Sequence, residues 1–187
     1  MKNNKRIIIG LVGPIGCGKG AVSNYLHKKY DFHVITMGDI IREELKKRNL
    51  EITRENSYKM QAELRGKNPH YLINSIVKKI NENLWEKVVI DGIRYPHQAM
   101  IPKKIFGKEF KLLLIDASPE IRYKRLVKRG REDKPESYDD FLNQEKKENE
   151  IFNLKKTYSL ADEKIINEGT LLNLYKKIDK ILEKEEE

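Results

Sequence analysis

A glycine-rich segment near the N-terminus carries the clearest chemistry in the sequence. Gly13, Gly16 and Gly18 precede Lys19 in the pattern G-x-x-x-x-G-K, directly after the apolar run Ile7–Val12. Glycines let consecutive backbone N–H groups turn toward one anion, and the start of a helix adds the positive end of its dipole. A lysine at this place supplies a mobile charge for outer phosphates. The pattern predicts a loop that binds a nucleoside triphosphate, because a plain turn needs fewer glycines, each of which costs about 1 kcal/mol relative to alanine.

The same segment departs from the general pattern where a metal ion would bind. Gly20 and Ala21 follow the lysine, where serine or threonine usually contacts Mg²⁺. We therefore expect the metal to rely on phosphate oxygens, water and a carboxylate elsewhere. Cys17 is either a small residue that fits the loop or a reactive thiol near a positive helix end. The residues expected to contact the nucleotide are Gly13, Pro14, Ile15, Gly16, Cys17, Gly18, Lys19, Gly20 and Ala21.

A second candidate residue is the aspartate that closes a later apolar run. Asp91 follows three β-branched residues, Val88–Ile90. Because the carboxyl ends of parallel strands meet at one edge of a sheet, its carboxylate should emerge beside the bound phosphates. We expect Asp91 to act in catalysis and to hold Mg²⁺ through water. The alternative is an ordinary strand-end turn.

Arginines at helical spacing form a third group. Arg122, Arg125 and Arg129 can present one stripe of guanidinium groups to a cleft and stabilise charge that grows during phosphoryl transfer. The alternative is a solvated basic helix face. Earlier in the chain, Asp39 stands at a predicted helix start, which it can cap, and Arg42 lies one turn further on.

Apolar periodicity predicts the elements that must position these residues. Predicted strands alternate with predicted amphipathic helices, so we expect a parallel sheet covered on both faces in a single domain over 1–187. The expected strands are Ile7–Val12, His33–Thr36, Val88–Asp91, Phe110–Ile115 and Glu163–Ile166. The expected helices are Lys19–Tyr30, Gly38–Asn49, Arg54–Leu64, Pro69–Asn83, Pro119–Arg129, Tyr138–Leu160 and about 170–182.

Composition narrows the class of protein. The 187 residues are 39% hydrophobic and 36% charged, which supplies a core beneath a heavily solvated surface. The net charge of +9 fits either a phosphate-binding cleft with lysine-rich faces or a nucleic-acid footprint; because lysines alternate with glutamates, we favour the cleft. One cysteine excludes an intramolecular disulfide, and the first apolar run is too short for a membrane helix. We expect a cytoplasmic monomer or homodimer with no membrane contact.

The phosphate loop, read as G-P-x-G-x-G-K-G, resembles the adenylate kinase and nucleoside monophosphate kinase family. Met37–Arg42 is similar to its T-G-D-x-x-R segment, and Asp91–Arg94 is similar to its D-G-F-P-R segment with one residue fewer. The resemblance implies that Arg42 and Arg94 serve the acceptor phosphate and that Gln98 reads the acceptor base. We also expect Asp39 at the substrate, where it joins Asp91 in orienting hydrated Mg²⁺ or the acceptor hydroxyl. It also implies that one of the two arginines four residues apart, Arg125 and Arg129, covers the donor adenine. The other meets the transferring phosphoryl group, a role we expect of Arg129.

Further segments extend the resemblance to Ile7–Leu182. Residues 161–170 resemble the C-terminal signature of dephospho-CoA kinases, which implies nucleotide contacts from Asn167 and Gly169. The whole pattern is most similar to small archaeal and bacterial proteins described as adenylate-kinase-like or dephospho-CoA-kinase-like. The resemblance implies that 38–86 is a helical acceptor-binding insert and 130–137 a short lid. We add the hypothesis that Arg65, within the insert, contacts the acceptor phosphate.

The sequence therefore predicts a P-loop NTPase, a three-layer α/β/α sandwich around a five-stranded parallel sheet. We expect an ATP- and Mg²⁺-dependent kinase acting on a nucleotide-like acceptor, first a nucleoside or deoxynucleoside monophosphate. Dephospho-CoA is the second acceptor. A rival of another class is an ATPase switch that binds RNA or a protein partner.

Overall fold

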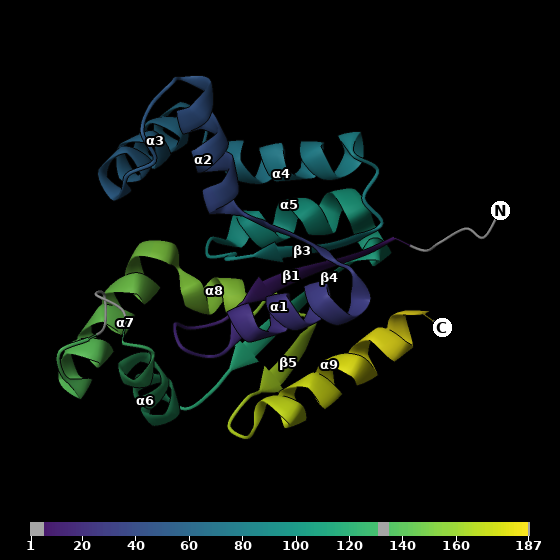
Figure 1. Cartoon of the computed structure of the whole chain (residues 1–187), viewed down its shortest axis with the longest axis vertical. Coiled ribbons are helices and arrows are strands. Elements are labelled where there is room, and N and C mark those ends of the chain that lie inside the picture. The colour runs from purple at the N-terminus through teal and green to yellow at the C-terminus, as the bar shows by residue number, and fades with distance from the viewer. Residues whose placement is uncertain (1–5, 131–134, 187) are drawn as a thin grey trace.

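Five parallel strands form the centre of the protein, as predicted. The computed structural model describes residues 6–130 and 135–186. The strands lie in the order β2-β3-β1-β4-β5 (Figure 1). They span Ile7–Val12 (β1), His33–Thr36 (β2), Lys87–Asp91 (β3), Phe110–Asp116 (β4) and Glu163–Ile166 (β5). The fold is thus the predicted α/β P-loop architecture.

The central strand β1 shows why both faces of the sheet are covered. Every residue of β1 is buried. Successive side chains alternate between two separate hydrophobic clusters: Ile8 and Val12 belong to one, and Ile7, Ile9 and Leu11 to the other. A strand buried on both faces needs a layer of helices on each.

Helices form the two outer layers. One hydrophobic cluster joins the sheet to α1 (Lys19–Tyr30) and α9 (Leu171–Glu186). The other joins it to α4 (Tyr71–Glu82) and α5 (Pro96–Phe106). The chain thus builds three layers, helix, sheet and helix, around one sheet.

The region between β2 and β3 is helical, as the sequence predicts. It contains α2 (Met37–Lys47), α3 (Arg54–Lys67) and α4. Thr36 caps α2 by accepting a hydrogen bond from the backbone N–H of Asp39, and the Asp39 carboxylate accepts one in return from the N–H of Thr36. The register pairs Thr36 with Asp91 on the neighbouring strand, so α2 begins beside Asp91.

Two differences from the predicted elements go beyond shifts of a few residues at their ends. The helix α5 is not predicted from the sequence, because Pro102 lies inside it and a proline in a helix interior argues against a helix. The predicted helix 138–160 is two helices, α7 (Tyr138–Phe152) and α8 (Leu154–Tyr158). Asn153 separates them with a left-handed backbone, φ 52°.

The remaining elements are α6 (Pro119–Arg129) and the short 3₁₀ turn η1 (Gly107–Glu109).

Helices of the insert and of the C-terminal half lie on opposite sides of one sheet edge. In Figure 1, α2 and α3 lie at the top and α6 and α7 at the lower left, and the carboxyl ends of the strands point between them. Ligands of open α/β sheets bind at this edge, so the functional residues are to be sought here. Among the described residues, no helix is both long and apolar enough to cross a bilayer.

Candidate active site

The phosphate loop connects β1 to α1 in the way the glycine spacing predicts. Gly13, Gly16 and Gly18 have φ values of 148°, 78° and 109°, which side chains rarely tolerate. A Cβ on Gly13 would lie 2.0 Å from the carbonyl oxygen of Ile115, and one on Gly18 would lie 2.5 Å from Nδ2 of Asn167. The loop therefore needs glycine both for its turns and for its close packing.

Lys19 begins α1 and folds back over this loop. Its Nζ donates hydrogen bonds to the carbonyl oxygens of Gly13, at 2.7 Å, and Pro14, at 3.0 Å. The ammonium is thereby held across the mouth of the loop. A phosphate oxygen bound by the loop would compete with these carbonyls for the same three donors.

A cavity of about 790 Å³, here called the loop cavity, lies on this segment. The predicted loop residues that line it are Ile15, Gly16, Gly18, Lys19, Gly20 and Ala21. Asn167 and Gly169 line it from the C-terminal side of β5. The side chain of Cys17 is instead fully buried in the core beneath the loop, which places its thiol away from solvent.

Asn167 holds the loop in place. Its buried Nδ2 donates to the carbonyl oxygen of Cys17 at 2.8 Å, and its backbone N–H donates to the carbonyl of Asp116. The lack of a side chain at Gly18 makes room for this amide. The Asn167 side chain therefore ties the end of β5 to the phosphate loop.

Two of the predicted cleft arginines line the loop cavity. Arg125 donates from Nη2 to the carbonyl oxygen of Asn167 at 2.9 Å, and its Nη1 is buried without a hydrogen-bond partner among the described residues. Arg129 lines the same cavity from the exposed end of α6. Since a buried unpaired donor is costly, Nη1 of Arg125 can offer a hydrogen bond to a group that enters the loop cavity.

Arg122 does not join this stripe, which corrects the prediction. Only 4% of it is exposed, and its guanidinium pairs with both carboxylate oxygens of Glu145 on α7. It also donates to the carbonyls of Ala117 and, at 3.3 Å, Ile15. Arg122 therefore fastens α7 to the phosphate loop. Sequence spacing gave no signal of this, because the partner lies 23 residues away on another helix.

A second cavity, of about 510 Å³, opens between the helical insert and the sheet edge and is called the insert cavity. Its predicted residues are Arg65, Arg94 and Gln98. Tyr58 and Phe152, not predicted from the sequence, add aromatic surface to it. The cavity therefore combines two fixed cations with aromatic walls.

The two arginines of the insert cavity rest on aromatic rings. The guanidinium of Arg65 lies 4.7 Å from the ring centre of Tyr95 and donates to its hydroxyl at 3.1 Å. The guanidinium of Arg94 lies 5.0 Å from the ring centre of Phe152 and 3.7 Å from a carboxylate oxygen of Glu148. Ring faces hold such cations in position while leaving donors for an anion.

Asp39 and Arg42, predicted to serve the acceptor, pair with each other on the first turn of α2. Neither is among the residues that line the insert cavity, although Gly38 between β2 and Asp39 is. Burial raises the pKa of Asp39, but hydrogen bonds from Thr36 and Arg42 outweigh it and hold that pKa below the ordinary value. The Asp39 carboxylate thus serves mainly to cap α2.

Asp91 connects the two cavities. It lines both, and in the described residues it is the one carboxylate that does so. Its Oδ2 accepts a hydrogen bond from Oγ of Ser23 at 2.7 Å. Sequence reasoning missed Ser23, which lies one helical turn after Lys19.

The donor set fits a hydrated Mg²⁺ better than a cage made by protein alone. Within 6–130 and 135–186 no three acidic, histidine or cysteine side chains gather to hold an ion. Mg²⁺ commonly binds through one or two carboxylates, substrate phosphates and several waters. Asp91 beside the phosphate loop supplies such a carboxylate.

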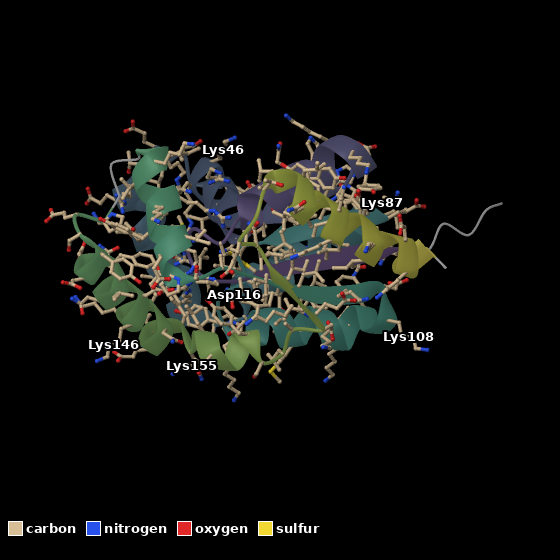
Figure 2. The ribbon with its side chains drawn as sticks, turned by 90° about the horizontal axis from the view of Figure 1, so that it is seen from below. Lys46, Lys87, Lys108, Asp116, Lys146 and Lys155 are labelled. Atoms are coloured by element: carbon tan, nitrogen blue, oxygen red, sulfur yellow. The ribbon has the colours of Figure 1, made fainter. Side chains whose placement is uncertain are left out.

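The predicted lid, residues 130–137, contains 131–134, which lie outside the described residues. For the basic surface, Figure 2 shows Lys46, Lys87, Lys108, Lys146 and Lys155 at separate places around the molecule. This spread is typical of solvated lysine-rich faces.

The sheet order, the glycine loop on its central strand and the cavities meeting at Asp91 define a P-loop protein of the kinase-like type. A family model described as "AAA domain" matches residues 9–153. The UPF0200 protein of Pyrococcus abyssi is 37% identical over 95% of this chain and 96% of its own length. That of Methanocaldococcus jannaschii is 34% identical over 95% and 89%. The chain belongs to this UPF0200 family.

Solved structures agree with the fold. Shikimate kinase from Acinetobacter baumannii, in complex with shikimate, superposes with a TM-score of 0.63 at 17% identity, over 96% of this chain and 94% of that one. TT1252 from Thermus thermophilus gives a TM-score of 0.59 at 20% identity, over 96% and 98%. The predicted resemblance to P-loop kinases is thereby confirmed for the architecture.

Proposed function

We propose that this protein transfers the γ-phosphoryl group of ATP to a nucleoside or deoxynucleoside monophosphate. The observation that carries the proposal is the position of Asp91 between two cavities. One contains the phosphate loop and Lys19, and the other contains Arg65 and Arg94. A donor triphosphate and an acceptor monophosphate need two such anion sites that share one reacting centre.

The residues of the two cavities contact different reactants. Loop amides and Lys19 hold the outer phosphates of ATP, while Arg125 and Arg129 stabilise charge on the transferring group. Arg65 and Arg94 bind the acceptor phosphate from the other side. Mg²⁺, held near Asp91 through water, supplies charge neutralisation to the triphosphate when bound. Positioning and electrostatics suffice for in-line transfer, so no covalent intermediate on the protein is expected.

Aromatic surface in the insert cavity supports a nucleotide as acceptor. The rings of Tyr58 and Phe152 line a space of about 510 Å³ together with the two arginines. A planar base can stack on such rings while the phosphate meets the guanidinium groups.

The dephospho-CoA alternative depends on the segment 161–170, whose side chains have structural partners. Asp162 accepts a hydrogen bond from the N–H of Leu112 at 2.8 Å and pairs with Lys103. Asn167 holds the phosphate loop. These contacts give Asp162 and Asn167 structural roles, so their presence does not require dephospho-CoA as the acceptor. A nucleoside monophosphate remains our first choice.

The test is a product assay. The protein is incubated with ATP and Mg²⁺ and a panel of NMPs, dNMPs and dephospho-CoA, and ADP and the new phosphorylated product are both quantified. Lys19→Met is the control. We expect it to lower transfer at least about 100-fold, because the positive charge that faces the outer phosphates is removed. Release of inorganic phosphate alone, with every acceptor, would refute the proposal and favour the ATPase switch.

A further inference from the structure

Thr157, on α8, is a fully buried polar residue that lines neither the loop cavity nor the insert cavity. Its Oγ1 donates a hydrogen bond to the carbonyl oxygen of Arg94 at 2.8 Å. The carbonyl oxygen of Asn153, one helical turn earlier, is further away, at 3.4 Å. Because a hydroxyl has a single hydrogen to donate, its main partner is the carbonyl of Arg94.

The carbonyl that Thr157 holds belongs to the connection between β3 and α5. Residues 92–95 form this connection and are neither helix nor strand. Oε1 of Gln98 accepts hydrogen bonds from the backbone N–H groups of Arg94, at 2.9 Å, and Tyr95, at 3.1 Å. The peptide group between Arg94 and Tyr95 is therefore held at its oxygen by Thr157 and at its nitrogen by Gln98.

These contacts set the direction in which the side chain of Arg94 leaves the backbone. That side chain is 52% exposed, so packing alone does not fix it. Its guanidinium must nevertheless stay at the insert cavity, beside the ring of Phe152. A rotation of the backbone at Arg94 would displace the guanidinium at the far end of a long side chain, and a misplacement of about 1 Å can cost as much as 100-fold in rate.

The turn at Asn153 brings Thr157 to this carbonyl. Its left-handed backbone ends α7 and begins α8. In Figure 1, α8 extends from the end of α7 toward the sheet, and it packs against α5. On α7, Glu148 and Phe152 contact the guanidinium of Arg94, and on α8 the hydroxyl of Thr157 contacts its carbonyl. Two consecutive helices thus hold both ends of one arginine.

We propose that Thr157 is a positioning residue of the acceptor site. Its hydroxyl fixes the backbone of Arg94, so that the guanidinium meets the acceptor phosphate in the insert cavity. The inference rests on the proposed function, in which Arg94 binds that phosphate. Removing the hydroxyl should therefore weaken acceptor binding and leave ATP binding intact, whereas a threonine with a structural role alone would affect only stability.

Two substitutions separate the hydroxyl of Thr157 from its methyl group. Thr157→Val keeps the shape but leaves the carbonyl of Arg94 unpaired. With the monophosphate that is phosphorylated fastest, we expect the acceptor KM to rise at least about fivefold and the ATP KM to stay within about twofold of wild type. Thr157→Ser keeps the hydroxyl and loses a methyl group, so it should lower the melting temperature but keep the acceptor KM within about twofold of wild type. Ser159→Ala removes an exposed hydroxyl at the end of the same helix and should change neither quantity.

A double-mutant cycle with Arg94→Ala tests whether Thr157 acts through this arginine. Arg94→Ala alone should raise the acceptor KM at least about tenfold, because charged hydrogen bonds to the phosphate are lost. Alanine keeps the backbone carbonyl, so Thr157→Val should lower the melting temperature with either residue at position 94. Its effect on the acceptor KM should disappear once the guanidinium is absent.

The outcomes separate the inference from the proposed function. If Arg94→Ala raises the acceptor KM but Thr157→Val leaves it at the wild-type value, the inference is overturned and the proposed function stands. The inference also fails if Thr157→Ser raises the acceptor KM as much as Thr157→Val, or if the effect of Thr157→Val is the same without the guanidinium. Should Thr157→Val not fold, Thr157→Ala, which also lacks the hydroxyl, replaces it under the same criteria.

Two outcomes count against the proposed function itself. If Arg94→Ala leaves the acceptor KM unchanged, the acceptor role of Arg94 is wrong, and the role of Thr157 is refuted with it. If no monophosphate is phosphorylated, the proposed function fails as a whole, and the inference fails too.

Discussion

Replacing Arg122 with methionine tests the idea that this arginine fastens α7 to the phosphate loop. The guanidinium makes two hydrogen bonds to Glu145 and two to backbone carbonyls, one of which belongs to Ile15 in the loop. Methionine keeps most of the apolar stem, so little cavity forms. The substitution leaves a carboxylate and two carbonyls without their donor.

The size of the effect follows from burial. Removing one partner of a buried ion pair costs about 3–5 kcal/mol. The Glu145 side chain is 25% exposed, so water partly replaces the lost partner. We therefore expect the free energy of unfolding to fall by about 3 kcal/mol, at the low end of that range. For a chain of this length the melting temperature should drop by about 6–12 °C.

The assay is denaturant unfolding followed by circular dichroism, with two matched variants. Lys124→Met, on the exposed face of the same helix, should change the unfolding free energy by less than about 0.5 kcal/mol. The double variant Arg122→Met with Glu145→Leu should recover part of the loss, because no unpaired charge remains. A single Arg122→Met variant that unfolds within about 1 kcal/mol of wild type would refute the reasoning.

Three further predictions concern the site and its pH dependence. Ser23→Ala removes the 2.7 Å hydrogen bond that orients Asp91, so we expect a several-fold rise in the Mg²⁺ concentration giving half-maximal activity, measured by titration against Ser23→Thr. Glu148→Gln releases Arg94 for the acceptor phosphate; steady-state kinetics should show the acceptor KM falling about two- to fivefold while the ATP KM stays constant. Burial, aided by a neighbouring histidine, lowers the pKa of His97, so the unfolded state binds more protons. Stability should therefore decline as pH falls through about 6.5, and His97→Gln should flatten that decline between pH 7 and 5 in unfolding titrations.

Local signals in the sequence were enough to predict most of the fold. Apolar runs such as Val88–Ile90 predict buried strands because a sheet covered on both faces needs continuous apolar residues. The phosphate loop is defined by spacing within a few residues, so Lys19 and its glycines are placed correctly relative to α1. The helix α5 was missed because Pro102, tolerated in its interior, is a local signal against helix.

Contacts between distant segments could not be predicted in this way. The role of Arg122 depends on Glu145, and that of Asp91 on Ser23, 68 residues earlier. Nothing in local spacing distinguishes Arg122, buried in an ion pair, from Arg125, which lines a cavity on the same helix. The face of α6 that becomes buried is decided by its packing against α7 and the phosphate loop, which the spacing of residues within α6 does not reveal.

Cys17 gives the protein a built-in reporter of loop opening. It is the single thiol of the chain and is fully buried beneath the phosphate loop. A thiol reagent can reach it only when the loop and α1 separate from the core, so the labelling rate measures the free energy of that local opening. Ligands that bind the phosphate loop should slow the labelling of Cys17 in proportion to their occupancy. Nucleotide affinity can then be measured without a catalytic assay.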